Sequence, residues 1–124
     1  MNLIINLAPY KYRYRPEYGS ENLLIEFIRA VENETFITDL LEAIQSIKPE
    51  IVDLNDLWMN DEVLYTINST LGEFTFSKDI WDLAFIMVDN NQICIAKINE
   101  LLVADNRFEK IEVNFEDYKT KVIE

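Results

Sequence analysis

The spacing between apolar residues changes once along this chain, and no other feature of the sequence limits the possible folds as strongly. From Glu21 to Pro49, apolar residues recur three or four positions apart, as they do on one face of an amphipathic helix. After Trp58 they alternate with polar residues, which is the period of a β-strand. Helices followed by strands predict an α+β fold, in a single domain over residues 1–124, with N-terminal helices packed on a mainly antiparallel sheet.

Two helical stripes are expected in the first half of the chain. The first begins after Ser20, a residue type favoured at helix N-caps, and the second ends before Pro49, which cannot continue a helix. The pattern fits two helices or one bent helix. The apolar members are Leu23, Leu24, Phe27, Ile28 and Val31 in the first stripe and Phe36, Ile37, Leu40, Leu41, Ile44 and Ile47 in the second.

The second half of the chain predicts a meander of strands with one helix. A strand at 63–67 and another around Phe74 and Phe76 flank the turn Ser-Thr-Leu-Gly. The segment from Trp81 to Val88 is nearly all apolar, which is typical of a central strand buried on both faces. The elements expected after it are a turn at 89–92, a strand at 93–95, a short helix with Ile98, Leu101 and Leu102 inward, and a closing strand from Phe108 to Phe115.

Residues 10–15, Tyr-Lys-Tyr-Arg-Tyr-Arg, lie between Pro9 and Pro16 and are expected to be extended, after a short strand at 2–7. Alternation then places the three tyrosines on one face and the three cations on the other. Stacking rings and phosphate-binding cations would point in opposite directions, which argues against a nucleic-acid surface. We expect the tyrosines to cover the core, and the cations to pair with the chain's own carboxylates or to protect an edge strand.

No catalytic or metal-binding motif is recognisable in the sequence. Histidine, the commonest general base and metal ligand, is absent, and the one cysteine, Cys94, lies among apolar residues. The stretch from Asp89 to Glu100 has acids at both ends of a calcium-loop template, but Ile93 and Cys94 stand where that loop needs an oxygen ligand and a glycine. We therefore expect a protein that is not an enzyme, with no cofactor, no metal ion and Cys94 in the core.

Charge is the strongest global signal in the sequence. The formal net charge is −12, and because the first 15 residues carry three cations and no acid, the rest of the chain holds 8 cations against 23 acids. Such a surface repels nucleic acids and anionic membranes and attracts a basic protein, although acidic charge also serves solubility alone. We expect a protein partner, no nucleic acid, no membrane contact, and a chain that is a monomer or a weak homodimer.

The sequence also suggests where the protein resides. The longest apolar run, from Leu83 to Val88, is much shorter than the roughly 20 residues of a membrane-spanning helix. The first residues, MNLIINLA, lack the positive charge that precedes the apolar region of a secretory signal. A cytoplasmic protein is therefore expected.

The candidate partner-binding residues are acids that lie near tryptophan in the sequence. The run from Glu50 to Glu62 holds five acids and no cation around Trp58, and carboxylates that ring an aromatic side chain suit the docking of a basic protein. A solvated loop is the competing interpretation. A second group of acids flanks the aromatic residues between 74 and 81, which are expected in the core. The candidates are Asp53, Asp56, Trp58, Asp61, Glu62, Glu73, Asp79 and Asp82.

Two consecutive segments carry a family resemblance. LGEFTFSKDIWDLAFIMVDNNQICIAKINELL (71–102), followed by NRFEKIEVNFEDYK (106–119), resembles small bacterial immunity proteins of contact-dependent growth inhibition and related polymorphic toxin systems. In that group, strands that end in an Asn-rich turn precede a short helix and a closing strand. The resemblance implies an antitoxin that binds the C-terminal toxin domain of its cognate partner and occludes it, and it implies no catalysis. It assigns no individual binding residue.

Three other functions remain open from the residues. The chain fits an acidic nucleic-acid mimic or regulatory protein that binds a host nucleic-acid-binding protein. Asp53 and Asp56 are spaced closely enough to be considered as a catalytic carboxylate pair. The tyrosines and cations of residues 10–15 would form an RNA-binding strand if they converged on one face.

Overall fold

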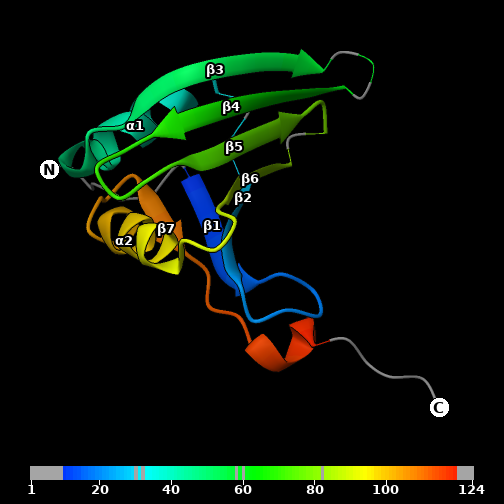
Figure 1. Cartoon of the computed structure of the whole chain (residues 1–124). Helices are drawn as coiled ribbons and strands as arrows, with labels where there is room; N and C mark the ends of the chain where they lie inside the picture. The colour runs from blue at the N-terminus through cyan, green and yellow to red at the C-terminus, as the bar shows by residue number, and fades with distance from the viewer. Residues whose placement is uncertain are drawn as a thin grey trace, which may run out of the picture.

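The computed structural model describes residues 10–29, 31, 33–57, 59, 61–81 and 83–119. Seven strands form one sheet in the order β3-β4-β5-β6-β2-β1-β7 (Figure 1). Five neighbouring pairs are antiparallel, and β1 and β7 are parallel, so the sheet is mixed. The α+β class is confirmed, while the strand expected at 2–7 lies outside the described residues. The strands are β1 (Tyr10–Pro16), β2 (Leu23–Arg29), β3 (Glu50–Leu57), β4 (Glu62–Asn68), β5 (Phe74–Asp79), β6 (Ala84–Met87) and β7 (Phe108–Lys110).

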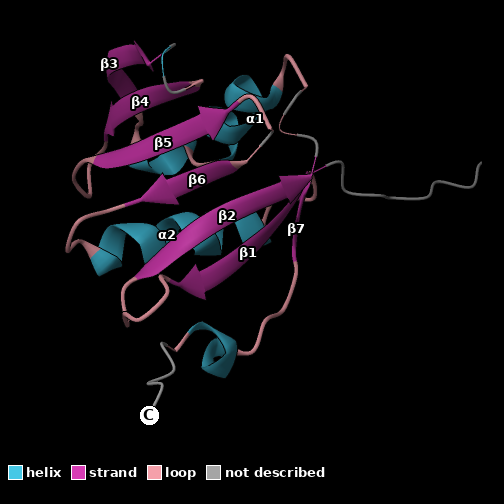
Figure 2. Ribbon diagram, turned by 90° about the vertical axis from the view of Figure 1, so that its right-hand side faces the viewer, coloured by secondary structure: helices cyan, strands magenta, loops and turns pink. Residues whose placement is uncertain are grey.

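Two α-helices, α1 (Phe36–Ala43) and α2 (Gln92–Val103), cover one face of the sheet, and both lie behind it in Figure 2. A 3-10 turn, η1 (Gln45–Ile47), extends α1 and completes the second helical stripe expected from the sequence. The ring of Phe36 lies 4.9 Å from that of Phe27 in β2 and 5.7 Å from that of Phe76 in β5, measured between centroids. Neither described α-helix is long and apolar enough to cross a membrane.

The helix expected over residues 21–31 is wrong, because Leu23–Arg29 forms β2 in the middle of the sheet. Ile25 and Phe27 are fully buried under the helices, and Leu24 on the opposite face is only 6% exposed. A strand that buries apolar residues on both faces loses its alternation, and its spacing then imitates a helical stripe. Ser20 caps no helix; its hydroxyl accepts a hydrogen bond from the Asn22 amide in the β1–β2 turn.

The turn at 89–92 and the strand at 93–95 are also wrong, because Gln92 begins α2. The Asn91 side-chain oxygen accepts a hydrogen bond from the Cys94 amide at 3.2 Å, so the Asp-Asn-Asn run is an N-cap instead of a hairpin turn. Cys94, Ile95, Ile98 and Leu102 then fall on one helical face, and all are fully buried. Cys94 is thus a core residue, as predicted.

Two expected strands are shorter than the sequence indicated. β6 spans only Ala84–Met87, since Trp81 and Leu83 lie in the exposed β5–β6 turn. The closing strand β7 ends at Lys110, and a 3-10 helix, η3 (Phe115–Tyr118), follows it. The strands expected at 63–67 and around Phe74 are confirmed as β4 and β5.

The turn Ser69–Gly72 between β4 and β5 forms as expected and is tied to the start of α2. The Gly72 amide donates to the Ser69 carbonyl, and Asn91 donates its side-chain amide to the Leu71 carbonyl. Gly72 has a φ of +110°, and a Cβ there would lie 2.5 Å from the Asn91 side-chain nitrogen. Only glycine fits this position without strain.

Candidate functional site

The tyrosine–cation stretch is strand β1, and its side chains face as alternation predicts. Tyr10 and Tyr12 are fully buried under the helices, and the Tyr12 hydroxyl donates to the Asn99 side chain in α2 at 2.9 Å. Burial raises the pKa of Tyr12 well above its ordinary value. β1 is flanked by β2 and β7, so it is not an edge strand.

The cations of β1 are bound to the chain's own carboxylates, as the sequence predicts. Lys11 pairs with Glu109 at 2.6 Å, and Arg13 and Arg15 pair with Glu26 at 3.5 and 2.9 Å. Arg15 is 7% exposed, because the rings of Tyr118 and Phe85 also cover its guanidinium, at 4.9 and 5.9 Å from their centroids. An arginine held in this way stabilises the fold and offers little to an external phosphate.

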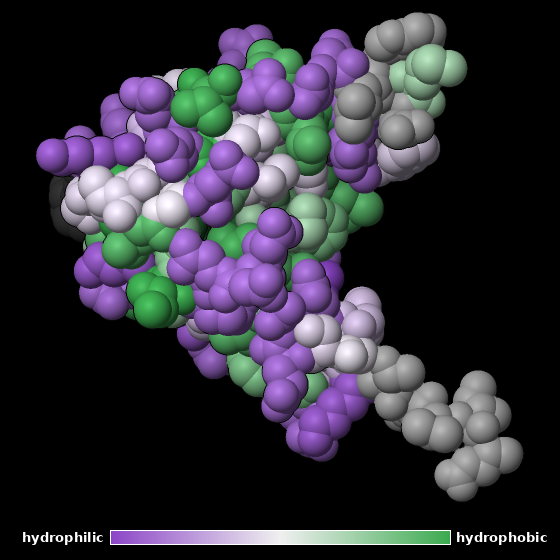
Figure 3. All heavy atoms as spheres, in the orientation of Figure 1, coloured by the Kyte–Doolittle hydropathy of each residue, from purple (hydrophilic) through white to green (hydrophobic). Residues whose placement is uncertain are grey.

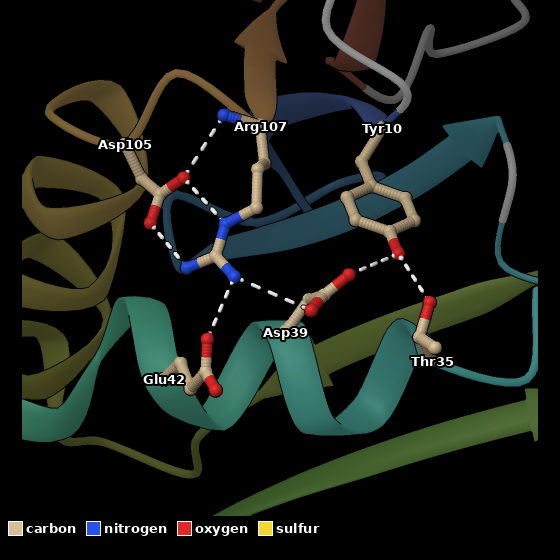
Figure 4. A network of polar contacts seen from close by, with 6 residues as sticks. All are labelled: Tyr10, Thr35, Asp39, Glu42, Asp105 and Arg107. Carbon is tan, nitrogen blue, oxygen red and sulfur yellow. Dashed lines mark hydrogen bonds and ion pairs between the residues drawn. The ribbon is translucent and has the colours of Figure 1, made fainter.

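Arg107 is the centre of a second cluster of charges (Figure 4). Its guanidinium donates to Asp105 at 2.7 Å, to Glu42 at 2.8 Å and to Asp39 at 3.3 Å, which joins α1 to the α2–β7 connection. Its hydrogen bonds lower the pKa of Asp105, and the carboxylates raise the pKa of Arg107 itself. The Tyr10 hydroxyl donates to Asp39 at 2.6 Å, and burial together with that carboxylate raises the pKa of Tyr10. Each group in the cluster has a partner, so the cluster is structural.

Cys94 is not an activated thiol. Burial raises the pKa of its thiol, which forms a hydrogen bond with the Ser69 hydroxyl, 4.0 Å from the sulfur. The thiolate form that a nucleophile needs is therefore disfavoured.

The β3–β4 hairpin contrasts with these clusters, because none of its described acids forms an ion pair. Within the part of the chain that the structure describes, no ion pair involves an acid of β3, of β4 or of the turns beside them. Every side chain from Glu50 to Asp56 is exposed, since the helices do not reach this edge of the sheet. The solvated-loop interpretation is wrong for this run, which is a strand, although its carboxylates are solvated. The acids concerned are Glu50, Asp53, Asp56, Asp61, Glu62 and Asp79.

A hollow of about 580 Å³ lies where the β3–β4 loop meets the β5–β6 turn. The Ile80 amide donates to the Asp61 carbonyl at 3.1 Å and holds the two turns together. Four carboxylates and a single ammonium line the hollow, over a base that includes Val63 and Tyr65. The ammonium of Lys78 donates to the Val31 carbonyl at 2.7 Å, so part of its hydrogen bonding is already used. The charged residues of the lining are Asp56, Asp61, Glu62, Lys78 and Asp79.

Asp79 has a structural task in addition to its charge. One of its carboxylate oxygens accepts hydrogen bonds from the amides of Trp81 and Leu83, at 2.9 and 3.0 Å. These bonds shape the β5–β6 turn and hold Trp81 outward, where its side chain is 67% exposed.

Exposed apolar side chains, of which Ile80 lines the hollow itself, lie in the same two turns as these acids. Met59 in the β3–β4 loop is 79% exposed, and Ile80 in the β5–β6 turn is 64% exposed. We call the acids of the hollow together with these side chains the tip surface. Trp81 was expected in the core; Asp82, which separates it from the apolar run Leu83–Val88, was the one local signal against that expectation. The members of the tip surface are Asp56, Met59, Asp61, Glu62, Asp79, Ile80, Trp81 and Leu83.

The structure brings four of the predicted partner-binding residues together, namely Asp56, Asp61, Glu62 and Asp79. Glu73 precedes β5 at the opposite end of that strand and does not belong to the group. Trp58 and Asp82 lie outside the described residues. The members of the tip surface that the predicted set lacks are Met59, Ile80, Trp81 and Leu83.

Asp53 and Asp56 do not form a carboxylate pair. A bulge lies between Ile51 and Asp53, and Asp53 pairs with Thr66 while Asp56 pairs with Val63. Since Thr66 and Val63 lie three apart on β4, the two aspartates point to opposite faces of the sheet. Among the described residues, no group of three acids, histidines or cysteines is arranged to hold a metal ion.

No protein-family model, curated protein sequence or solved structure matches this chain.

Proposed function

We propose that this protein is a binding inhibitor of the immunity type, which neutralises a basic toxin domain by covering its active or substrate-binding surface. The observation that carries the proposal is the separation of charge: the described cations of β1 and β7 are paired, while no ion pair among the described residues involves an acid of the tip surface, where apolar side chains are exposed. The resemblance of residues 71–102 and 106–119 to immunity proteins supports the same function. We place the protein in the cytoplasm, where such a toxin would meet its substrate.

The physical basis of binding has two parts. Unpaired carboxylates attract a basic surface and speed its encounter, and a nuclease domain is basic because its substrate is a polyanion. Exposed ion pairs alone contribute only about 0–1 kcal/mol each, so a tight complex also needs buried anchors. Trp81 and its neighbour in the chain Ile80, both exposed, supply apolar area of the kind that interface centres contain.

The test is co-expression with the toxin domain encoded beside this protein's gene. We expect growth to be restored and the two proteins to co-purify, with an association rate that falls as salt concentration rises. Absence of a complex together with absence of protection would refute the proposal. Capture of a host nucleic-acid-binding protein, without any effect on the toxin, would favour the nucleic-acid mimic instead.

Two matched variants locate the binding surface. Trp81→Ala should weaken the complex at least tenfold, because an exposed tryptophan is a typical interface anchor. Phe115→Ala removes an aromatic ring that is 46% exposed on η3, away from the tip surface, and should leave the affinity unchanged. Equal loss in both variants would place the interface elsewhere.

A further inference from the structure

The open edge of the sheet, strand β3, has the features of a docking site for another strand. In the described part of the chain it has a neighbour on one side only, β4, and it is eight residues long. At about 3.3 Å per residue, the edge is roughly 26 Å long. In an antiparallel pair, alternate residues direct both backbone groups away from the partner strand, so half of the β3 residues present N–H and C=O groups to the open side.

β3 lacks several of the devices that usually protect an edge. Natural edge strands are kept short, or carry charged side chains (above all lysine), proline, a β-bulge or a covering segment. Of these, β3 has three acids and a bulge. β7, at the other edge of the sheet, is three residues long. β3 is long and has no lysine or proline within it, and its apolar side chains are half exposed: Ile51 by 41%, Val52 by 50% and Leu54 by 54%. Its one irregularity is the bulge at its beginning.

The side chains of β3 differ in polarity between the two faces of the sheet. Ile51 and Leu54 pair with Ile67 and Tyr65, whose side chains lie on the helix-covered face of the sheet. Asp53 lies on the opposite face. An added strand would therefore meet apolar side chains on one face and the Asp53 carboxylate on the other. Asp56 lies near the end of β3.

Charge decides which strand can add. A second copy of β3 aligned at Asp53 would place that carboxylate against the same residue of its partner, and like charges opposite each other destabilise a strand pair. A strand that alternates apolar residues with lysine or arginine would extend the apolar face and place its cations on the same face as Asp53. Proteins that recognise peptides by strand addition gain affinity from backbone hydrogen bonds and specificity from alternate side chains.

We infer that the protein binds its partner by strand addition, with a basic, alternating β-strand of the partner hydrogen-bonded to the open edge of β3. The inference rests on the proposed function, for which it supplies the mode of binding. The tip surface, at the end of the same hairpin, would then hold the flanking part of the partner.

The test uses the full chain and an eight-residue peptide of alternating lysine and valine with blocked ends. The peptide should slow hydrogen exchange at β3 amides and bind in a salt-dependent manner. The same peptide methylated on alternate backbone nitrogens keeps its charge but loses its donors, and it should bind at least tenfold more weakly. A peptide of alternating glutamate and valine should not bind.

A matched pair of variants separates the edge from net charge. Asp53→Asn with Asp56→Asn should weaken the lysine–valine peptide at least fivefold. Glu34→Gln with Asp117→Asn removes the same charge at exposed sites outside β3 and should weaken it less than twofold.

Three outcomes would overturn the inference: no binding of the lysine–valine peptide, binding that methylation leaves unchanged, or sedimentation that shows a dimer joined through β3. Its failure is distinguishable from that of the proposed function. A toxin domain that is neutralised without protection of β3 amides would refute strand addition alone. Peptide binding at β3 without any toxin protection would refute the immunity function alone.

Discussion

The two ends of the sheet carry charge in opposite ways. At the β1–β7 end, the cations Lys11, Arg13 and Arg15 each lie beside a carboxylate of the same chain. At the β3–β4 end, the described acids have no cation partner, and apolar side chains are exposed among them. Figure 3 shows hydrophilic and hydrophobic side chains intermixed along the upper margin, where β3 runs in Figure 1.

The difference separates charge that holds the fold together from charge that is free for a partner. Pairing at the β1–β7 end joins strands and helices that are distant in sequence, as Arg107 does between α1 and β7. Acids at the β3–β4 end contribute little to folding, because they are solvated and form no ion pair within the described part of the chain. The contrast makes predictions for stability that do not depend on the identity of any partner.

The largest contrast is expected between core and edge. Phe27→Ala should lower the free energy of unfolding by about 3–5 kcal/mol, because it empties a fully buried site among aromatic rings. Leu54→Ala, at a side chain that is 54% exposed, should cost less than about 1 kcal/mol. Urea denaturation followed by circular dichroism measures both. If Phe27→Ala does not fold, Phe27→Leu should still lower the free energy of unfolding more than Leu54→Ala does. Equal losses would contradict the contrast between core and edge.

The second prediction concerns the buried cation. Arg15→Met should lower stability by about 2 kcal/mol, because it leaves the Glu26 carboxylate, 13% exposed, with the more distant Arg13 alone. Replacing Glu26 by leucine in the same chain should recover part of the loss, since both charges are then gone. Lys48→Met, which removes an exposed cation with no described ion pair, is the control and should change stability little.

The third prediction concerns pH. Hydrogen bonds from Arg107 hold the pKa of Asp105 below its ordinary value, so the unfolded chain binds a proton at a higher pH than the folded chain does. The stabilisation from this group is therefore present above about pH 4, the ordinary aspartate value, and is lost as pH falls through the lower folded value. Asp105→Asn should flatten the acid limb of stability. In an Arg107→Gln background the same substitution should have a smaller effect, because only the backbone amide of residue 107 still donates to Asp105. An effect of unchanged size would mean that the Arg107 side chain does not lower this pKa.

The smallest effect is expected at the open edge. Asp53→Asn with Asp56→Asn should change stability by no more than about 0.5 kcal/mol, and in the stabilising direction, because neither acid has an ion pair and both lie in an acidic region. The paired variant Glu34→Gln with Asp117→Asn controls for net charge. If the double variant lost more than about 1 kcal/mol of stability, these acids would contribute to folding, contrary to the prediction.

The sequence alone determined the features that depend on local alternation and on composition. Tyrosines and cations in β1 alternate strictly, so their opposite faces follow from strand geometry alone. β4 and β5 alternate in the same way, and the excess of acids outside the first 15 residues predicts an acidic surface. Burial of Cys94 followed from its apolar neighbours, whether the segment was a strand or a helix.

Only the tertiary structure decided the rest, because it depends on which layers cover each segment. The apolar spacing of β2 looks helical because apolar residues are buried on both of its faces. The start of α2 looks like a strand in the sequence, and only the structure shows that Asn91 caps a helix there. Trp81 is exposed because the hydrogen bonds of Asp79 turn the chain outward before β6 begins. Pairing of charges also depends on segments that are distant in sequence: the fold gives the β1 cations their acids and leaves those of β3 without a described partner, which no local pattern specifies.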